Sequence, residues 1–380
     1  MARLGDICTL VNGYAFKPTD WKTEGLPIIR IQNLNDTTAP FNYFEGEIDN
    51  KYVVNDGDLL FSWSGTPGTS FGAFFWRRGK GVLNQHIFNV YPVEGVTKEY
   101  LRYALNGNIG RIIDKAHGGV GLQHITKKEL VEIDIPILSE DQQKQIVTVL
   151  DSVDKLIALR NEQLVKLDQL VKSRFIELFG MPGTDTNGWG LIPLGEACQV
   201  NPKKGQDKRM VSGLTVSFVP MPAVSEKGEI DPSETREYDT VKTGFTYFAE
   251  NDVLFAKITP CMENGKGAVA RGLYNGIGFG STEFHVLRPI SGKTNPYWLY
   301  MLTAFSQFRE DAANNMTGSA GQRRVPASFL ENYRVSVPPM GLQEQFAAFV
   351  EQTDKSKFDL KQSLEKLETL KISLMQQYFG

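Results

Sequence analysis

The chain has 380 residues, of which 41% are hydrophobic and 22% are charged, and its net charge is −3, as is typical of a globular protein with two or three domains. The net charge disfavours a simple basic nucleic-acid binder, and three cysteines without a paired spacing disfavour a zinc site. Because no stretch approaches about 18 apolar residues and the N-terminus lacks a signal-peptide pattern, we expect a cytoplasmic protein that does not cross a membrane.

Residues 1–138 are predicted to form a mixed α/β domain. Short stretches rich in β-branched and aromatic residues, bounded by turn formers, are typical of strands and occur at 26–31, 52–54, 58–62 and 87–92. A helical spacing of apolar residues follows at 99–113, and a polar, glycine-rich loop covers 116–124. The stretch 130–137 is predicted to be a further strand that leads into a long helix.

Residues 139–180 are predicted to be one long helix. Ser139 and Gln142 have the spacing of a capping box at its start, and Gly180 is suited to end it. Apolar side chains recur every three or four residues, with a mean period of about 3.5 that is typical of a coiled coil. Only Arg160 and Arg174 interrupt this apolar seam, whose members are Ile146, Leu150, Val153, Ile157, Leu164, Leu167, Val171 and Leu178.

The last residues of the chain repeat this helix. The sequence from Gln343 to Gly380 matches that from Gln143 to Gly180 without a gap. A surface helix on a globular domain is the plainer interpretation of one such stretch, but a seam on both copies favours packing of the two helices against each other. The second seam is weaker, because Lys357 and Lys371 intrude, and its apolar members are Leu360, Leu364, Leu367 and Leu374.

The region between the two helices repeats the first domain. Asn251–Phe255 matches Gly57–Phe61, and Glu283–Pro289 matches His86–Pro92. Elements that persist while the loops between them differ indicate an internal repeat. The predicted order is therefore a domain at 1–138, a helix at 139–180, a second domain at 181–340 and a second helix at 341–380.

The sequence lacks the catalytic patterns that we expect in a nucleic-acid enzyme. The Asn/Asp-Pro-Pro-aromatic loop with which amino-methyltransferases hold their target nitrogen is absent, and no glycine-rich strand-to-helix turn suits a nucleotide. Four histidines without a paired spacing disfavour a metal hydrolase. Two repeated domains without catalytic groups indicate recognition, for which loop residues are suited: Arg and Lys neutralise phosphates, while Arg, Asn and Gln read base edges.

The second domain and the helix starts carry a family signal. Asp252–Lys266, which reads DVLFAKITPCMENGK, is similar to a frequent signature of one class of target-recognition domain, and Gly280–Pro289 and Gly318–Val325 look like further parts of that class. Both helices begin with a Gln-rich run, at 141–143 and 343–345. On these residues the chain resembles the specificity subunit (HsdS) of type I restriction–modification enzymes along essentially its whole length.

This resemblance implies an α+β fold of two similar target-recognition domains, each followed by a long α-helix, with the two helices packed as an antiparallel coiled coil. Each domain would bind one half of an interrupted target in double-stranded DNA, and the helix pair would set the gap between the halves. The subunit would catalyse nothing and would bind no metal or cofactor. It would recruit two methyltransferase subunits (HsdM) that carry S-adenosylmethionine, and motor-nuclease subunits (HsdR) that use ATP and Mg.

The predicted DNA-binding residues lie in the loops of both domains, although a solvated surface is the plainer interpretation of any single cluster. Lys is suited to phosphates, and Arg, Asn and Gln are suited to bases. The candidates are Arg77, Arg78, Lys80, Gln85, His117 and Gln123 in the first domain, and Lys257, Thr259, Asn264, Lys266, Gln322, Arg323 and Arg324 in the second. Two alternatives stay open, a stand-alone DNA methyltransferase and a repeated-domain scaffold that binds proteins.

Overall fold

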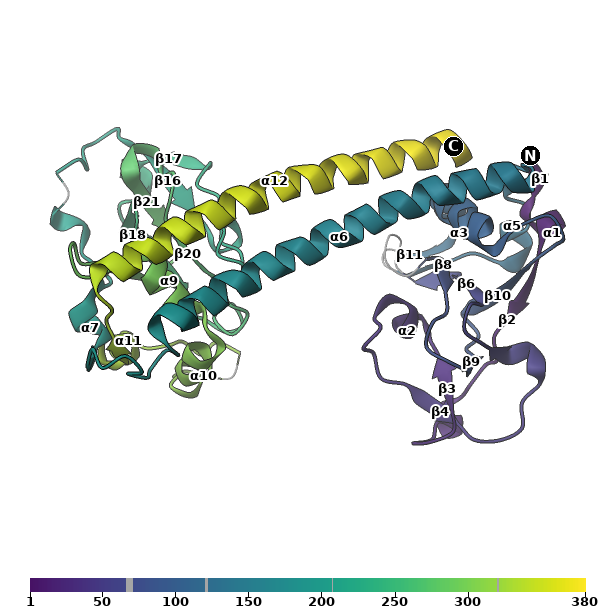
Figure 1. Ribbon diagram of the computed structural model, residues 1–380, viewed down its shortest axis with the longest axis horizontal. Helices are drawn as coiled ribbons and strands as arrows, with labels where there is room; N and C mark the ends of the chain where they lie inside the picture. The colour runs from purple at the N-terminus through teal and green to yellow at the C-terminus, as the bar shows by residue number, and fades with distance from the viewer. Residues whose placement is uncertain (66–70, 120–121, 207, 320) are drawn as a thin grey trace. The chain divides into compact units, whose positions relative to one another are not determined.

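The computed structural model of the protein describes residues 1–65, 71–119, 122–206, 208–319 and 321–380, with the backbone alone at 118, 119, 122, 123 and 206. The chain divides into two compact units: unit 1 consists of residues 1–161 and 361–380, and unit 2 of residues 162–360. The division falls inside the two long helices, α6 (Glu140–Phe179) and α12 (Met340–Phe379). Each unit therefore combines one globular domain with part of both helices (Figure 1), whereas the boundaries predicted from the sequence lie at the helix ends.

The described residues of unit 1 form three sheets and a separate strand pair. The main sheet has the order β2-β10-β6-β8, the second β4-β3-β9-β5 and the third β11-β12-β7, while β1 pairs with β13. The strands are β1 (Ala2–Arg3), β2 (Cys8–Asn12), β3 (Leu26–Ile29), β4 (Asn42–Phe44), β5 (Val53–Val54), β6 (Leu59–Ser62), β7 (Ser64–Gly65), β8 (Gly72–Phe75), β9 (Gly81–Leu83), β10 (Ile87–Pro92), β11 (His117–Gly119), β12 (Leu122–His124) and β13 (Asp134–Ile135). The helices are α1 (Leu4–Ile7), α2 (Ile31–Asn35), α3 (Lys98–Gly107), α4 (Ile109–Asp114) and α5 (Lys127–Leu130), with 3-10 turns η1 (Pro18–Asp20) and η2 (Asn50–Tyr52).

The main sheet of unit 1 is covered on both faces. Successive side chains of a strand point to opposite faces, and all four residues of β6 are buried. Leu59 and Phe61 pack with α3 in one hydrophobic cluster, whereas Leu60 packs with residues of β3 and β9 in another. This double burial explains why β6 is an unbroken apolar run instead of an alternating pattern.

Unit 2 repeats this plan. Its main sheet has the order β15-β22-β19-β20, the second sheet β17-β16-β21-β18, and β14 pairs with β23. The strands are β14 (Leu191–Pro193), β15 (Cys198–Val200), β16 (Thr215–Val219), β17 (Thr235–Glu237), β18 (Thr246–Ala249), β19 (Val253–Ala256), β20 (Gly267–Val269), β21 (Ile277–Gly280), β22 (Phe284–Pro289) and β23 (Arg334–Ser336). The helices are α7 (Leu194–Ala197), α8 (Tyr238–Val241), α9 (Pro296–Ala304), α10 (Ser306–Asn314) and α11 (Ala327–Asn332), with 3-10 turns η3 (Lys204–Gln206), η4 (Met221–Ala223) and η5 (Tyr274–Gly276).

The main sheets of the two units have the same topology. The antiparallel order β15-β22-β19-β20 corresponds strand for strand to β2-β10-β6-β8. An isolated bridge between Thr317 and Arg324 corresponds to the pairing of His117 with His124 at the open end of β11 and β12. The predicted fold class, two similar α+β domains each followed by a long helix, is confirmed.

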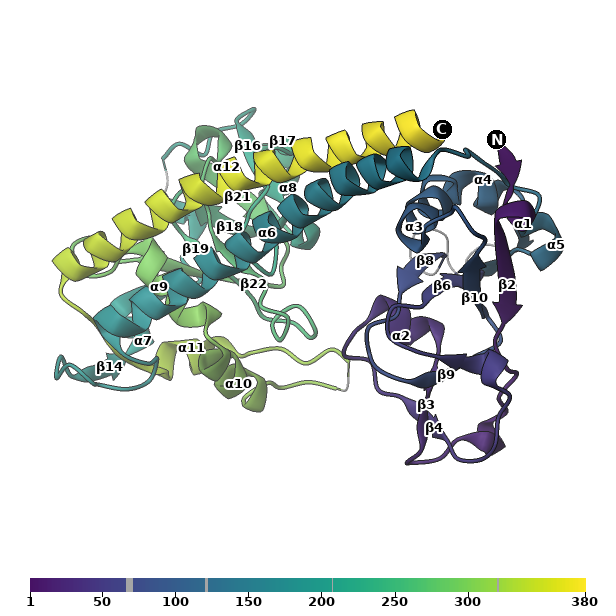
Figure 2. The ribbon, with the colours of Figure 1, turned by 45° about the vertical axis from the view of Figure 1, so that its right-hand side comes forward.

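The long helices pack against each other in opposite directions. Asp154 pairs with Lys371 at 2.6 Å and Asp168 pairs with Lys357 at 2.8 Å, so the partner's residue number falls as the number along α6 rises. Both views show α6 and α12 side by side (Figures 1 and 2), and the predicted antiparallel packing is confirmed. Among the described residues, no helix combines the length and the hydropathy of a membrane span.

The predicted seam residues face inward on both helices. All of their side chains are buried or half-buried. They are Ile146, Leu150, Val153, Ile157, Leu164, Leu167, Val171 and Leu178 on α6, and Leu360, Leu364, Leu367 and Leu374 on α12. Three of the four polar residues that interrupt the seam have partners across it: Lys357 and Lys371 bind aspartates of α6, and Nε of Arg160 donates to Ser363 at 3.3 Å. The fourth, Arg174, pairs with Glu177 of its own helix. The polar positions are therefore compatible with the coiled coil.

The helix ends are part of the globular cores. Phe379 of α12 packs in the unit 1 core, with its ring centroid 5.5 Å from that of Tyr100. Phe179 of α6 packs in the unit 2 core, 5.5 Å from Phe346. Phe379 and Phe179 are 1% and 5% exposed, and burying a side chain of this size contributes about 1.5–3 kcal/mol. Each domain is thereby tied to both helices.

A buried glutamine fixes the start of each long helix to its domain. Gln143 accepts a hydrogen bond from the backbone N–H of Thr97, the N-cap of α3, and donates to the carbonyls of Gly95 and Leu138. Gln343 has the same role in unit 2.

Gln343 accepts from the backbone N–H of Asn295, the N-cap of α9, and donates to the carbonyls of Lys293 and Pro338. Gln143 and Gln343 are 1% and 0% exposed, and a buried amide of this kind requires such partners. We call these two residues the glutamine clamps. Because each glutamine anchors the start of one long helix, glutamine recurs at the same place in both copies of the helix.

Candidate nucleic-acid interface

One corner of the main sheet has the same backbone connections in both units, and we call it the strand-end corner. In unit 1 it lies where β6 ends and β10 begins. The backbone N–H of Trp63 donates to the carbonyl of His86 at 3.3 Å, and the N–H of Ile125 donates to the carbonyl of Trp63 at 3.1 Å. The residue before Ile125 is His124, the last residue of β12.

The strand-end corner of unit 2 lies where β19 ends and β22 begins. The N–H of Lys257 donates to the carbonyl of Glu283 at 2.9 Å, and the N–H of Val325 donates to the carbonyl of Lys257 at 2.9 Å. Lys257, Glu283 and Arg324 therefore occupy the places of Trp63, His86 and His124. The scaffold is the same in both units, while the side chains that it presents are different.

Four of the candidates predicted in the second domain meet at this corner: Lys257, Thr259, Arg323 and Arg324. The guanidinium of Arg324 forks onto the carboxylate of Glu283, with Nε 2.9 Å from Oε2 and Nη2 2.8 Å from Oε1. These bonds lower the pKa of Glu283 below its ordinary value. Burial lowers the pKa of Lys257. The corner of unit 2 is thus a compact, mixed-charge site.

A second carboxylate, Glu263, holds the edge of the same corner. It accepts from the hydroxyl of Thr259 at 3.0 Å, and Arg323 lies 3.7 Å from it. The backbone N–H of Thr259 also donates to the carbonyl of Arg323 at 3.1 Å. Arg323 is half-exposed at 45% of its side chain, so its guanidinium reaches solvent.

The remaining unit 2 candidates lie around the turn at 260–265. Asn264 and Gln322 are exposed, while the ammonium of Lys266 donates to the carbonyl of Met221 at 3.3 Å. This turn rests on a buried arginine that the sequence patterns do not single out. Arg309 of α10 donates from Nη1 to the carbonyl of Met262 at 2.6 Å and is 7% exposed. Its burial lowers the pKa of its guanidinium to about 10.

The candidates of unit 1 fall into two groups, of which one lies at the strand-end corner. The side-chain amide of Gln85 is 3.3 Å from Nε2 of His86, and His117 pairs with Glu129 of α5 while its ring meets that of His124. Burial lowers the pKa of His86. The backbone of Gln123 lies in β12, and its side chain falls outside the described part of the structure.

The other group, Arg77, Arg78 and Lys80, lies at the opposite end of β6. Phe75 pairs with Leu59, the first residue of β6, so this basic loop is separated from the corner by the length of a four-residue strand, about 13 Å. Arg78 is also committed to its own domain. Its guanidinium lies 4.0 Å from the ring centroid of Phe41 and donates to the carbonyl of Ala39.

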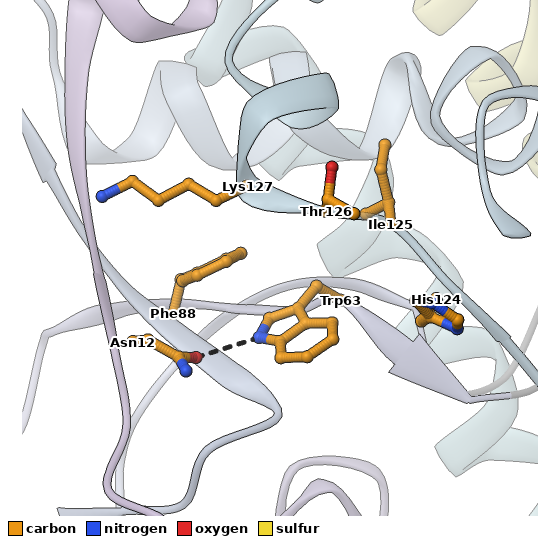
Figure 3. Close-up of a pocket in the computed structure, with 7 residues that line it drawn as sticks. All are labelled: Asn12, Trp63, Phe88, His124, Ile125, Thr126 and Lys127. Carbon is orange, nitrogen blue, oxygen red and sulfur yellow. Dashed lines mark hydrogen bonds between the residues drawn. The ribbon is translucent and has the colours of Figure 1, made fainter.

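A pocket adjoins the corner of unit 1 (Figure 3). It has a volume of about 400 Å³ and is lined by Asn12, Trp63, Phe88, His124, Ile125, Thr126 and Lys127. None of these residues belongs to the predicted set. The repeat could have identified Trp63, because the match of Gly57–Phe61 with Asn251–Phe255, carried two residues further, places Trp63 opposite Lys257. The same reasoning places His86 opposite Glu283.

Within the described ranges, no group of three or more His, Cys, Asp or Glu side chains is arranged to hold a metal ion. The candidate interface consists instead of polar, charged and aromatic side chains at equivalent corners of two repeated units. Two repeated α+β units, each followed by a long helix and each with its own set of side chains on a common scaffold, define a class of internally repeated two-domain proteins.

The comparison with known families gives this class a more specific identity. The family model for the type I restriction modification DNA specificity domain matches residues 1–169 and 187–371. The chain belongs to this family. The family is the specificity component, and not the catalytic component, of type I restriction enzymes.

Curated relatives match part of the chain. The chain is 38% identical over 194 residues to the type I restriction enzyme EcoEI specificity subunit of Escherichia coli. The matched stretch covers 49% of this chain and 31% of the relative. The chain is also 38% identical over 197 residues to the EcoAI specificity subunit of the same organism, covering 50% and 33%. The matched stretch thus spans about a third of each relative's length.

Solved structures share the fold over the whole chain. The S subunit of a type I restriction–modification system from M. genitalium is 14% identical and has a TM-score of 0.54, with 100% of this chain and 95% of that chain covered. A structure from a study of complex assembly and conformational transition of the type I R-M system is 18% identical with a TM-score of 0.58, covering 100% and 96%. At these identities the likeness concerns the fold alone.

Proposed function

We propose that the chain is the sequence-specific DNA-binding specificity subunit of a type I restriction–modification complex, and that each unit recognises one half of a bipartite target. The observation that carries this proposal is the strand-end corner, where one set of backbone hydrogen bonds presents different side chains in the two units. Such a repeated scaffold suits an asymmetric target, because each corner can select its own bases while the fold stays the same.

In unit 2, Arg324 is the proposed base reader. A guanidinium can bond in a bidentate manner to O6 and N7 of guanine, and the fork onto Glu283 holds its plane in one orientation. The side chain of Arg324 remains 41% exposed. Lys257 and Arg323 flank it and are suited to the phosphates on either side. Glu283 is thus a positioning residue in this proposal.

In unit 1, Gln85, His117 and Gln123 are the proposed polar contacts at the corner. The basic loop of Arg77, Arg78 and Lys80 lies at the other end of β6 and is assigned to phosphate contacts, because Arg78 packs on its own domain. A net charge of −3 is compatible with DNA binding if partner subunits share the contact with DNA. The carboxylates at the corner of unit 2, Glu283 and Glu263, already face Arg324 and Arg323.

The helix pair is proposed to set the gap between the half-sites and to provide docking surface for partners. Those partners are two methyltransferase subunits (HsdM) with S-adenosylmethionine, and motor-nuclease subunits (HsdR) with ATP and Mg. The chain itself would then hold no cofactor, and it would act in the cytoplasm with the cell's DNA. Apolar side chains that stay exposed on α6 and α12, such as Leu156, Val165, Leu170 and Phe358, support such docking.

Methylome sequencing of cells that carry this chain with its partner subunits tests the proposal. The expected result is an adenine-methylated motif of two defined halves separated by a gap of fixed length. The Arg324→Ala variant should relax one position of one half-site, with a loss of about 1–3 kcal/mol in binding if that position is guanine. The other half-site should not change. Motif-independent methylation, or no methylation that depends on the chain, would contradict the proposal.

A further inference from the structure

The pocket beside Trp63 contains a fixed aromatic surface. The indole N–H of Trp63 donates to the side-chain carbonyl of Asn12 at 3.1 Å. The ring stacks against Phe88, with centroids 5.7 Å apart and planes 27° from parallel, and lies 5.2 Å from the ring of His86. Phe88 is 3% exposed, whereas Trp63 is half-buried. Trp63 is therefore held in one orientation while part of its ring stays accessible.

In unit 2, a side chain spans the region that corresponds to this pocket. His285 stands where Phe88 stands in unit 1, and its imidazole reaches from Asn201 to the carbonyl of Val325 at 2.8 Å. Phe88 has no group that could make such a bond to Ile125. Between the aromatic pair and the segment 124–127 a cavity of about 400 Å³ remains (Figure 3). This volume lies in the range of about 300–1,000 Å³ that is typical of small-molecule sites.

The rim of this pocket carries hydrogen-bond donors. The ammonium of Lys127 uses one of its three N–H groups on the carbonyl of Leu10, which leaves two. The Asn12 carboxamide is bonded through its oxygen, and its NH₂ group provides further donors. His124 is exposed at the other side. The pocket thus combines a flat apolar wall with donors at its edge, which matches a heteroaromatic ring with acceptor atoms.

We propose that the Trp63 pocket binds a single nucleobase ring, which stacks on the indole of Trp63 while Lys127 and Asn12 donate to its edge. The inference rests on the proposed function, because the pocket adjoins the corner that is assigned to DNA. Base–aromatic stacking is tolerant of base identity, so the site adds affinity and not sequence choice. Two sources can supply such a ring, an unstacked base of the bound DNA or a free nucleotide.

Fluorine NMR of the full chain labelled with 5-fluorotryptophan tests the site directly. The chain has five tryptophans, Trp21, Trp63, Trp76, Trp189 and Trp298, and the Trp63→Phe variant assigns the resonance of Trp63 by its loss. The probes are a duplex with one unpaired base, the same duplex fully paired, and adenosine and ATP. The expected result is a shift of the Trp63 resonance with the unpaired-base duplex and a much smaller shift with the paired duplex.

Affinities for the same duplexes provide the second measurement. Trp63→Ala should weaken binding of the unpaired-base duplex by about 5- to 150-fold, the range for loss of one stacked base, and Trp63→Phe by less. Trp21→Ala is the matched control, because Trp21 belongs to the same unit and is 37% exposed; it should leave the affinity unchanged. The four remaining fluorine resonances of the Trp63→Ala variant report whether it is folded.

Each outcome has a definite consequence. If the Trp63 resonance shifts with ATP or adenosine but with neither duplex, the bound ring belongs to a free nucleotide. The proposal that the pocket binds a nucleobase ring then stands. Binding of paired and unpaired duplexes with the Trp63 resonance unmoved overturns the pocket and leaves the proposed function intact. Absence of binding to duplexes that carry the methylated motif, with the partner subunits present, overturns the proposed function, and the free nucleotides then decide whether the pocket binds a base ring at all.

Discussion

Asp252 and Asp58 occupy the same place in the two units, one residue before β19 and β6. Asp252 forms a fork with Arg288 at 2.6 and 2.8 Å and its side chain is 2% exposed. Asp58 meets Lys98 through a single contact of 3.1 Å and is 18% exposed. The two ion pairs therefore lie at the same place in the fold, and the aspartate of the first pair is more buried than that of the second.

Asp252→Ala should lower the free energy of unfolding by about 1–3 kcal/mol, because it removes the buried carboxylate that pairs with the Arg288 guanidinium, whose side chain is 27% exposed. Asp58→Ala should cost about 1 kcal/mol or less, as expected for a pair that stays in contact with water. Urea unfolding of both variants measures the difference. Equal costs would mean that burial does not determine the contribution of these pairs.

His285 gives unit 2 a dependence on pH. Its Nε2–H donates to the carbonyl of Val325, and Nδ1 accepts from the amide of Asn201 at 3.0 Å, so the ring is neutral in the folded protein. Burial lowers its pKa below the ordinary value of 6.5. The unfolded chain therefore takes up a proton more readily, and the stability that His285 contributes is complete above about pH 6.5 and is lost as the pH falls below it.

The free energy of unfolding should consequently decrease between pH 7.5 and pH 5.5, and His285→Gln should make this decrease smaller. Denaturant unfolding at a series of pH values is the measurement. An unaltered slope in His285→Gln would show that the ring does not titrate as its burial requires.

The sequence predicts the basic residues of the site better than their surroundings. Lys257, Arg323 and Arg324 stand out as charges in a family signature, but residue type alone does not tell which carboxylate they meet. Glu283 is 41 residues away from Arg324, and the two meet because β19 pairs with β22 on one side and the segment after β19 bridges to Arg324 on the other. Trp63 escapes prediction for a related reason, since an aromatic residue after a strand is most often part of a core.

At the level of elements, the long helices are the best predicted part of the chain. Their periodicity is local, so the seam follows from the sequence alone. The glutamine clamps are different, because Gln143 and Gln343 repeat in the sequence but their partners, such as Thr97 and Asn295, lie 46 to 48 residues earlier. A buried glutamine and an exposed one have the same appearance in a helical pattern.

Gln143→Leu should break the clamp of unit 1 while keeping the volume of the side chain. The N–H of Thr97 and two carbonyls then lose their partner, which should cost about 1–3 kcal/mol. Hydrogen exchange at the amide of Thr97 should become faster, whereas the amide of Asn295 in unit 2 should keep its rate. Gln343→Leu should reverse the pattern.

The exposed Gln145 provides the control for these variants. Gln145→Leu changes the same residue type on the same helix without touching the clamp, and it should alter neither amide. If Gln143→Leu left the exchange of Thr97 unchanged, the anchoring of the helix start would have to be assigned to its apolar contacts instead, those of Ile146 and Leu150 in the unit 1 core.

On the scale of the whole molecule, the helices belong to both units at once. Periodicity shows where a helix begins and ends, and so the sequence places domain boundaries at 138 and 340. The compact units divide at 161 and 360 instead, because the antiparallel partner brings the end of α12 into the core of unit 1 and the end of α6 into the core of unit 2. Such long-range partnership has no local signal.

This arrangement specifies how the helix pair, which is proposed to set the gap between the half-sites, can be lengthened. Pairs such as Asp154–Lys371 and Asp168–Lys357 fix the register on both sides of the midpoint. Seven residues inserted after Gln163 must therefore be matched by seven after Lys361, so that one heptad is added to each helix and all existing pairs are kept. An insertion in α6 alone should displace one set of pairs and lower the free energy of unfolding.

The double insertion should widen the gap of the methylated motif and leave both half-sites unchanged. One heptad adds about 10 Å of helix at 1.5 Å per residue, and a base pair rises by about 3.4 Å. The gap should therefore grow by at most about three base pairs, with the full increase only if the helices run parallel to the DNA. Methylome sequencing of cells with the double insertion is the measurement. Altered half-sites with an unchanged gap would assign the helices a role other than spacing, because the strand-end corners are far along the chain from the inserted residues.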